Sequence, residues 1–264
     1  MTQQIGTTNS ASPNGAYLTL SGTKYNDPWQ YVVIPDSPSL SISGEYTISS
    51  WVYRLNAGGD WRNLYDIPDA HLLEFSPEGG FDWRSENNNV DFNTNGPSLP
   101  EGQWHHIAAT MAKSGVGYTS SIYVDGQLVT DAPNWQIGRF QNSTGVRDSN
   151  ENLYLGILWS QRYGNPDPWA GSIDDFKIWN TSLSASEIRA VATNDYSVRR
   201  DHLVAEFTFD ADTGTTVHDS SGHNNNGTIV SASTLQPPTL PAPPTAQTAA
   251  PNGAYLTLSG TKYN

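Results

Sequence analysis

The chain contains no cysteine, which excludes disulfide bonds, a catalytic thiolate and cysteine-based zinc sites. Basic residues are also scarce, since 13 Lys and Arg stand against 26 Asp and Glu, for a formal net charge of −13. Binding to nucleic acid or to an anionic membrane surface depends on clustered Lys and Arg, so neither partner is expected. The excess of carboxylates instead favours a divalent cation such as calcium.

Long apolar runs are missing as well. No stretch approaches the roughly 18 uninterrupted apolar residues of a membrane span, so membrane insertion is not expected. Residues 1–10 (MTQQIGTTNS) lack both the basic start and the apolar core of a signal peptide, so none is visible in this chain. Aromatic residues, in contrast, make up 11% of the 264 residues, which excludes a wholly disordered chain and suits a single all-β domain.

An internal duplication divides the chain. Residues 13–26 read PNGAYLTLSGTKYN, and residues 251–264 repeat them letter for letter. Residues 234–250, which precede the second copy, are rich in Pro, Ala and Thr without apolar periodicity, as in a stiff, solvated linker. We therefore expect a flexible arm (1–12), a globular domain (13–233), this linker, and a detached copy of the first strand.

The globular part is predicted to be an antiparallel sandwich. Short segments rich in β-branched and aromatic residues alternate with clusters of Gly, Pro, Asn and Ser, which is typical of strands and turns. The predicted strands are Tyr17–Leu20, Tyr31–Ile34, Tyr46–Arg54, Trp104–Met111, Ser121–Val124, Gln127–Thr130, Leu153–Leu158, Ile173–Trp179 and Leu203–Asp210. Asp125-Gly126 is a preferred two-residue hairpin turn. One short helix is predicted over residues 185–192, where Ser184 and Glu187 have the spacing of a capping box.

Several segments together resemble the laminin-G-like, pentraxin-like group of concanavalin A-type jelly rolls. They are residues 31–40 (YVVIPDSPSL), 101–109 (EGQWHHIAA), 122–129 (IYVDGQLV) and 171–188 (GSIDDFKIWNTSLSASEI). The resemblance covers most of residues 13–229 and implies an all-β, two-sheet antiparallel jelly roll. It implies function only broadly, because this fold hosts lectins, adhesion modules and glycan hydrolases.

The order of segments departs from that family pattern. Residues 203–229 (LVAEFTFDADTGTTVHDSSGHNNNGTI) resemble a segment that begins a domain in many relatives, yet here they follow the body. Residues 201–233 therefore either close this domain or begin the next repeat. We favour the second alternative, a unit of a tandem array, because stacked copies at a fixed period are the usual cause of self-similarity. In either case the spare strand, residues 251–264, is a candidate for self-association, since an unpaired sheet edge accepts an added strand. The alternative, of equal weight, is a disordered tail that takes no part in the fold.

Asp174 is the first metal candidate. Strand alternation predicts that it shares a face with Phe176 and Ile178, without an adjacent Lys or Arg, so its carboxylate must be paired or bind a cation. The resemblance implies a structural calcium held by this Asp with backbone carbonyls near the first strand. We therefore expect Ca²⁺ at Asp174 with carbonyls of residues 21–27, and with Asp27 as a further ligand. The alternative is a surface Asp at a strand end. Asp210 is a weaker candidate, because its neighbourhood is typical of tight turns.

Aromatic residues beside polar, turn-like stretches are candidates for sugar binding, because rings stack on sugar C–H faces while amides and carboxylates bind hydroxyls. Each of these Trp residues is also consistent with a packed loop anchor, whereas Trp51, Trp104 and Trp179 lie within predicted strands and are expected in the core. The candidates are Trp29, Trp61, Arg62, Trp83, Arg84, Trp159, Tyr163 and Trp169.

A hydrolase of this fold needs two carboxylates about 5 Å apart. Residues 74–78 (EFSPE) contain a Pro and have the wrong spacing for one straight strand, and Glu206 and Asp210 would lie roughly 13 Å apart along theirs. We therefore expect no enzyme, but a calcium-stabilised module of a secreted or cell-surface protein that binds a glycan or an extracellular protein through its loops. The alternatives are a self-assembling module linked by strand exchange and, third, a glycan hydrolase.

Overall fold

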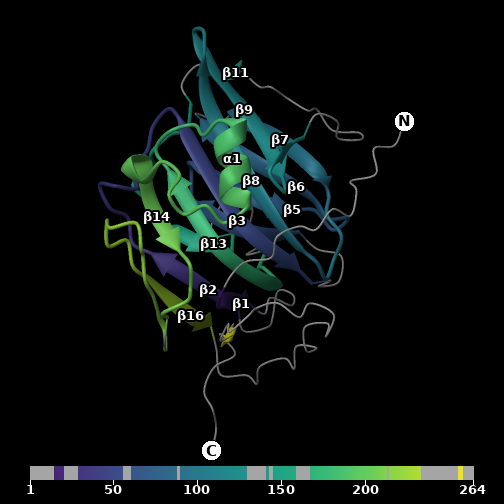
Figure 1. The fold of residues 1–264 in the computed structure, drawn as a ribbon, viewed down its shortest axis with the longest axis vertical. Coiled ribbons are helices and arrows are strands. Elements are labelled where there is room, and N and C mark those ends of the chain that lie inside the picture. Colours follow the sequence, from purple (N-terminus) through teal and green to yellow (C-terminus); the bar gives the residue numbers. More distant parts are fainter. Residues whose placement is uncertain are drawn as a thin grey trace, which may run out of the picture.

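The computed structural model describes residues 15–20, 29–55, 61–87, 90–129, 141–142, 145–158, 167–212, 214–232 and 255–257. These residues form two packed β-sheets, with one α-helix (α1, Ala185–Ala192) on the outer face of one sheet (Figure 1). The predicted all-β sandwich with one short helix is therefore confirmed. Within the described ranges, no helix has the length and apolar character that crossing a bilayer requires.

Sheet A carries the helix. Its strands, in spatial order, are β10 (Gln127–Leu128), β9 (Gly117–Val124), β8 (Trp104–Ser114), β3 (Tyr46–Arg54), β13 (Gly171–Trp179), β1 (Tyr17–Leu20) and β17 (Tyr255–Thr257), while β11 (Gln141–Asn142) pairs with β9 and β14 (Leu203–Phe207) with β13. All of these pairs are antiparallel except that of β1 with β17.

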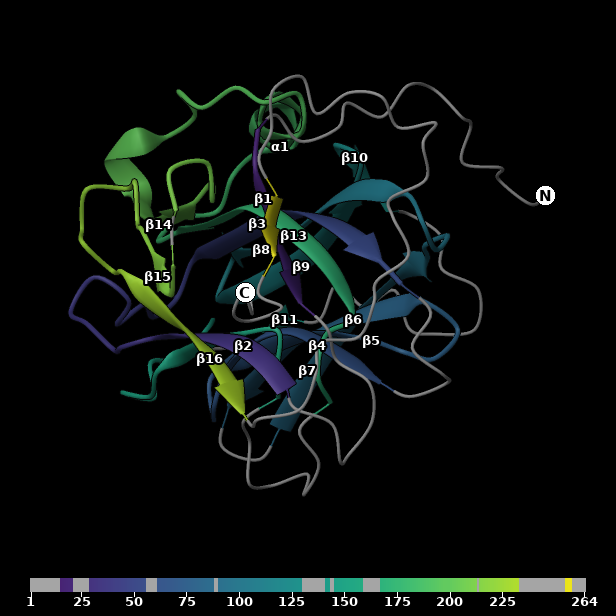
Figure 2. The same ribbon diagram turned by 90° about the horizontal axis from the view of Figure 1, so that it is seen from below.

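Sheet B forms the other layer, as the view from below shows (Figure 2). Its strands, in spatial order, are β15 (Thr216–Val217), β16 (Gly227–Ala232), β2 (Trp29–Ile34), β12 (Leu153–Leu155), β4 (Arg62–Ile67), β5 (His71–Phe75), β6 (Gly80–Asn87) and β7 (Val90–Ser98). A short 3₁₀ helix, Arg200–His202, precedes β14.

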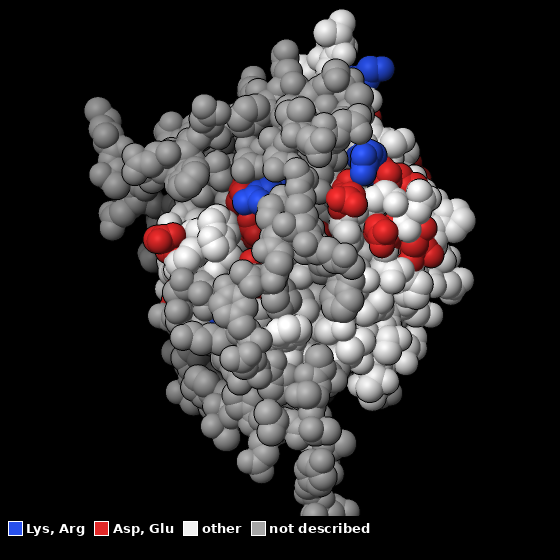
Figure 3. Space-filling view, turned by 180° about the vertical axis from the view of Figure 1, so that it is seen from behind, with Lys and Arg blue, Asp and Glu red and all other residues white. Residues whose placement is uncertain are grey.

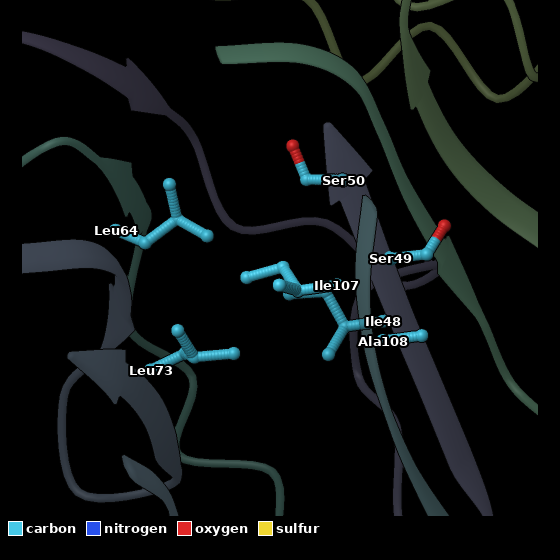
Figure 4. Close-up of a pocket in the computed structure, with 7 residues that line it drawn as sticks. All are labelled: Ile48, Ser49, Ser50, Leu64, Leu73, Ile107 and Ala108. Carbon is cyan, nitrogen blue, oxygen red and sulfur yellow. The ribbon is translucent and has the colours of Figure 1, made fainter. Parts of the chain in front are cut away.

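The core lies between the two sheets, because alternate side chains of each strand point inward. Ile48 and Ile107 of sheet A point toward Leu64 and Leu73 of sheet B across a narrow gap (Figure 4). The walls of this gap are chiefly apolar, and the Ser50 hydroxyl donates a hydrogen bond to the carbonyl oxygen of Asp174 at 3.0 Å. The gap is therefore part of the core packing.

The helix begins where the sequence predicts. The Ser184 hydroxyl accepts a hydrogen bond from the Glu187 amide, and the Glu187 carboxylate accepts one from the Ser184 amide at 2.7 Å, so the capping box is confirmed. Ile188 and Val191 pack with Trp179 in a cluster on the outer face of sheet A. The helix therefore covers the end of β13 rather than entering the main core.

The described residues between 201 and 232 add strands to both sheets. β14 pairs with β13 in sheet A, and β16 pairs with β2 and with β15 in sheet B. The arm (1–12) and the linker (234–250) lie outside the described residues.

Candidate functional site

Three polar residues stand side by side on sheet B. Asn63 of β4 is the register partner of Glu74 on β5, and Glu74 is the partner of Asp82 on β6. Phe75 and Phe81, their neighbours along the chain, belong to the core. Because successive side chains of a strand point to opposite faces, the row faces outward, away from the core.

Arg84 lies two residues beyond Asp82 on the same face. Its Nε pairs with Asp82 Oδ2 at 2.9 Å, and its Nη2 pairs with Glu74 Oε1. The Arg84 side chain keeps 18% of its surface exposed, whereas the two carboxylates keep 5% and 6%. We call Asn63, Glu74, Asp82 and Arg84 the outer-face cluster. Figure 3 shows this side of the molecule, on which basic atoms lie directly against acidic ones.

The environment of the cluster raises the pKa of Glu74. Burial, the largest cause, raises this pKa to about 7, although the Arg84 guanidinium lowers it; the carboxylates of Asp82 and Asp167 raise it further. The Asn63 amide is fully buried, and neither its Oδ1 nor its Nδ2 has a hydrogen-bond partner among the described residues. A buried amide without partners is costly, so this group is a candidate ligand contact.

Aromatic side chains continue the same face. A register row runs from Tyr154 on β12 through Asp66 and Leu72 to Arg84. The Tyr154 ring lies 6.4 Å from that of Tyr31, centroid to centroid, and Trp29 and Val33 pack against this pair. Tyr31 and Tyr154 are each only 7% exposed, so the outer face of sheet B combines a largely buried aromatic pair with the charged and amide groups of the outer-face cluster.

A β-bulge in β13 changes the face of sheet A on which Asp174 lies. The register of β13 against β3 shifts between Asp174 and Lys177, and Asp175 has a positive φ of 48°. Phe176 and Ile178 face the core, while Asp174 and Lys177 share the outer face of sheet A, so the predicted face is wrong. The extra residue of the bulge reverses the alternation that the prediction assumed. The Lys177 ammonium donates to Asp175 Oδ1 at 2.9 Å, and the Tyr196 hydroxyl donates to Asp175 Oδ2 at 2.9 Å.

Asp174 is fully buried, which rules out the alternative of a surface Asp. Its Oδ1 accepts the Asp175 amide at 2.8 Å, and its Oδ2 has no hydrogen-bond partner among the described residues. Burial, then the carboxylates of Asp175 and Asp210, raise the pKa of Asp174 well above its usual range. Asp210 Oδ1 in turn accepts the Ala16 amide at 2.7 Å, just before β1.

The structure therefore describes only some of the residues that we expect to bind calcium. Residues 21–27, whose carbonyls we expect as ligands, and the Asp27 side chain lie outside the described residues. Within the part of the chain that the structure describes, no three or more His, Asp or Glu side chains are grouped as a metal site. Of the expected side-chain ligands, the structure describes Asp174 and Asp210, and Asp210 accepts the amide of Ala16 just before the first strand.

Comparison with known proteins identifies the family. Residues 26–189 match the Laminin_G_3 model, described as the concanavalin A-like lectin/glucanases superfamily. The chain belongs to the Laminin_G_3 family. The resemblance predicted from the sequence is thus confirmed.

Among curated relatives, the Sushi, von Willebrand factor type A, EGF and pentraxin domain-containing protein 1 of Rattus norvegicus is 25% identical over 139 residues. The matched stretch is 49% of this chain but only 4% of that protein. Among solved structures, a candidate carbohydrate-binding protein from Bacteroides ovatus superposes with a TM-score of 0.58 at 15% identity, over 81% of this chain and 58% of the other. A native heptameric SAP-like pentraxin from Limulus polyphemus gives 0.46 at 14% identity, over 81% and 93%.

Two of the aromatic candidates of this Laminin_G_3 chain are packed in the core, in line with the alternative of a packed anchor. Trp83 is 1% exposed and donates from Nε1 to the Tyr65 hydroxyl at 2.8 Å. Trp169 is fully buried, with its ring 5.2 Å from that of Phe75. Strand alternation turns Trp83 inward between Asp82 and Arg84.

The other candidates are divided in space. Arg84 belongs to the outer-face cluster, and Trp29 is half-buried on the same face. Trp61 is 36% exposed, and Arg62 is buried with its Nη1 donating to the Pro168 carbonyl at 3.4 Å. Trp159 and Tyr163 lie outside the described residues. Among the described candidates, Arg84 and Trp29 lie on the sheet B face of this Laminin_G_3 domain.

Sequence reasoning missed Asn63, Glu74 and Asp82. Glu74 was weighed only against a carboxylate on its own strand, whereas its partner Asp82 lies across a turn on the next strand. The signal was present in the alternation of residues 73–75 (LEF) and 81–83 (FDW), each with one acidic residue between two apolar ones.

Proposed function

We propose that this Laminin_G_3 domain is a non-enzymatic carbohydrate-binding module, with its ligand on the outer face of sheet B. The observation that carries the proposal is the outer-face cluster beside the Tyr31–Tyr154 aromatic surface. Rings that stack on a sugar, next to polar groups that bind its hydroxyls, are the usual composition of such a site. The fold shared with the candidate carbohydrate-binding protein from Bacteroides ovatus supports this choice.

Each group of the cluster has a defined role in this proposal. The fully buried Asn63 amide has one donor and one acceptor group that the described protein leaves unused, and a sugar hydroxyl would match both once the groups that bury the amide are displaced. Arg84 is the most exposed member, with 18% of its side-chain surface exposed, so its guanidinium meets the ligand first. Glu74 and Asp82 hold the guanidinium in place through their ion pairs.

The position of Arg84 favours binding over hydrolysis. In a glycosidase the sugar lies between the acid and the second carboxylate. Here one guanidinium pairs with both Glu74 and Asp82, and its positive charge offsets the repulsion between the two carboxylates. The pair therefore supports a recognition site, although the superfamily also contains glucanases.

We also propose a structural calcium ion at Asp174. The fit rests on the buried Asp174 Oδ2 without a hydrogen-bond partner among the described residues and on the nearby Asp210 carboxylate. Oxygen donors of this kind suit Ca²⁺, which would offset the repulsion between the two acidic groups. Asp174 on β13 and Asp210 after β14 would hold the ion next to the start of β1.

An extracellular setting is part of the same proposal. The rat relative combines its matching region with sushi, von Willebrand factor type A and EGF domains, as its name states. We infer that the parent protein is secreted or displayed at the cell surface, where glycans are available. An extracellular protein partner on the same face is the alternative ligand.

A glycan array with the full chain is the direct test, followed by calorimetric titration of the glycans that bind. Asn63→Leu removes the unused amide at similar volume and should weaken binding at least about 10-fold, as expected for a lost pair of hydrogen bonds. Asn180→Leu, at an exposed position directly after β13, is the matched control and should leave affinity unchanged. Absence of any bound glycan, or equal affinity in both variants, would contradict the proposed site.

A separate measurement tests whether the domain hydrolyses the glycans that it binds. The bound glycans are incubated with the protein and the products are separated by chromatography. No release of shorter sugars is expected. Hydrolysis that disappears in Glu74→Gln would instead assign catalysis to the outer-face cluster.

A further inference from the structure

The first copy of the duplicated segment fills one strand position of sheet A. β1 pairs antiparallel with β13, with Leu18 opposite Ile173 and Thr19 opposite Ser172. Leu18 and Leu20 are fully buried in the main core. We call the position beside residues 171–173 of β13 the first-strand position.

The second copy lies next to it. β17 pairs with β1 in parallel, and identical residues are register partners: Tyr17 with Tyr255, Leu18 with Leu256 and Thr19 with Thr257. Figure 2 shows β17 as the short yellow strand beside β1. Because β1 is antiparallel to β13, β17 already has the direction that the first-strand position requires. It is displaced by one strand, or about 4.8 Å, without any reversal of the chain.

The contacts of the first-strand position depend on residues that both copies contain. Gly15 has a φ of +105°, and a Cβ atom there would lie 1.8 Å from Asp210 Oδ1, so glycine is required. The Ala16 amide donates to Asp210 Oδ1, and the Thr19 hydroxyl lies 3.0 Å from that of Ser172. The second copy has the same residues in the same order, from Gly253 to Leu258.

We propose that the first-strand position is a binding site for the strand that both copies contain, and that β17 of the same chain occupies it in exchange with β1. Identical side chains make identical contacts, so neither copy is favoured by its contacts there. The tether gives the second copy an effective concentration in the millimolar range, which exceeds that of any other chain in dilute solution. The sandwich therefore has two arrangements, each of which leaves one copy of the strand available at its edge.

Disulfide trapping in the full chain tests the exchange, and the absence of natural cysteines removes any background. In Ser172→Cys/Thr19→Cys, the two positions are register partners, and a disulfide should form. In Ser172→Cys/Thr257→Cys, the positions lie two strands apart in the present arrangement, beyond the reach of roughly 7 Å between Cα atoms. A disulfide within one chain of this second variant is expected only if the second copy enters the first-strand position. No disulfide, or disulfides only between chains, would overturn the proposal.

Stability of full-length variants provides an independent readout. A charge at Leu18 cannot be buried, but the intact second copy should then replace the first, so Leu18→Asp alone should change the unfolding temperature little. Leu256→Asp, the matched variant, should also be tolerated. Leu18→Asp/Leu256→Asp should lower the unfolding temperature by roughly 10 °C, because no intact copy remains. If Leu18→Asp alone causes the full loss, the two copies do not exchange.

Discussion

Glu74 on β5 and Asp82 on β6 lie directly opposite each other in sheet B, and the Arg84 guanidinium pairs with both. Two carboxylates on directly opposed residues of neighbouring strands repel each other unless a cation pairs with them or one of them is protonated. Arg84 supplies the cation, yet burial still raises the pKa of Glu74 to about 7. The pair therefore makes both the stability of sheet B and the charge of its outer face dependent on pH.

Relative to Glu74→Gln, the wild type should lose stability as the pH rises from about 4.5 to about 7. In that window the folded protein keeps a proton on Glu74 that the unfolded chain, with the usual pKa of 4.5, has released. This group therefore lowers the free energy of unfolding with rising pH, by about 3 kcal/mol over the whole window. His71 and His106, whose pKa burial lowers to about 3, contribute with the opposite sign, and both proteins share that contribution. Urea unfolding at pH 5 and pH 7.5 measures the difference.

Glu101→Gln is the matched control for this pH dependence. Glu101 pairs with Arg54 at 3.2 Å, but 36% of its side chain is exposed. Its substitution should leave the pH dependence of the wild-type chain intact. The same slope in Glu74→Gln as in the wild type would contradict the assignment to Glu74.

Arg84→Met should be destabilising, and more so at pH 8 than at pH 5. Removing the guanidinium leaves two buried carboxylates without a cation, and breaking a buried pair in this way costs about 3–5 kcal/mol. At pH 5 Glu74 is protonated, so less of this cost applies. Arg199→Met is the control, because 35% of the Arg199 side chain is exposed and its ion pairs, at 3.5 and 3.8 Å, should contribute less than about 1 kcal/mol. Equal losses in the two variants would show that the outer-face cluster is not a buried ion pair.

The sequence predicted those elements whose local chemistry agrees with the fold. Tyr46–Arg54, with its β-branched and aromatic residues, is a strand with the predicted bounds, and α1 spans the predicted 185–192. Asp125 and Gly126 both have positive φ, as the predicted hairpin turn requires. In each case a short-range signal, such as a cap or a turn residue, was sufficient to locate the element.

The strands that carry the candidate site were not predicted. β4 to β7 interrupt their apolar residues with Asn, Asp, Glu, Arg and Gly, which lowers the intrinsic preference for strands. Pairing between neighbours overrides that preference, and a pairing partner such as Asp82 for Glu74 is a non-local property. The bulge at Asp175 is missed for a related reason, since alternation along a strand holds only where no residue is inserted.

Ser184→Ala should destabilise the chain by about 1 kcal/mol, because it removes the side-chain cap of α1. Ser184→Thr keeps the hydroxyl and should retain most of the stability. Chemical unfolding of the three proteins at one pH measures the difference. An alanine variant as stable as the wild type would mean that packing of Ile188 and Val191 alone holds the helix on sheet A.

The effect of Asp174→Asn on stability should depend on calcium: the variant should be no less stable than the wild type without calcium, and less stable with it. Without a divalent cation, the substitution removes a buried charge whose pKa is raised by burial and by two neighbouring carboxylates, so the variant should be at least as stable as the wild type. With calcium at 100 times its dissociation constant, the wild type should gain about 2.7 kcal/mol and the variant much less. Thermal unfolding with EDTA and with millimolar calcium measures stability without and with the ion. Asp201→Asn is the control: its side chain is 69% exposed, and it should respond to calcium as the wild type does. If calcium leaves the wild type unchanged, or stabilises Asp174→Asn equally, the carboxylate at this position does not bind the ion.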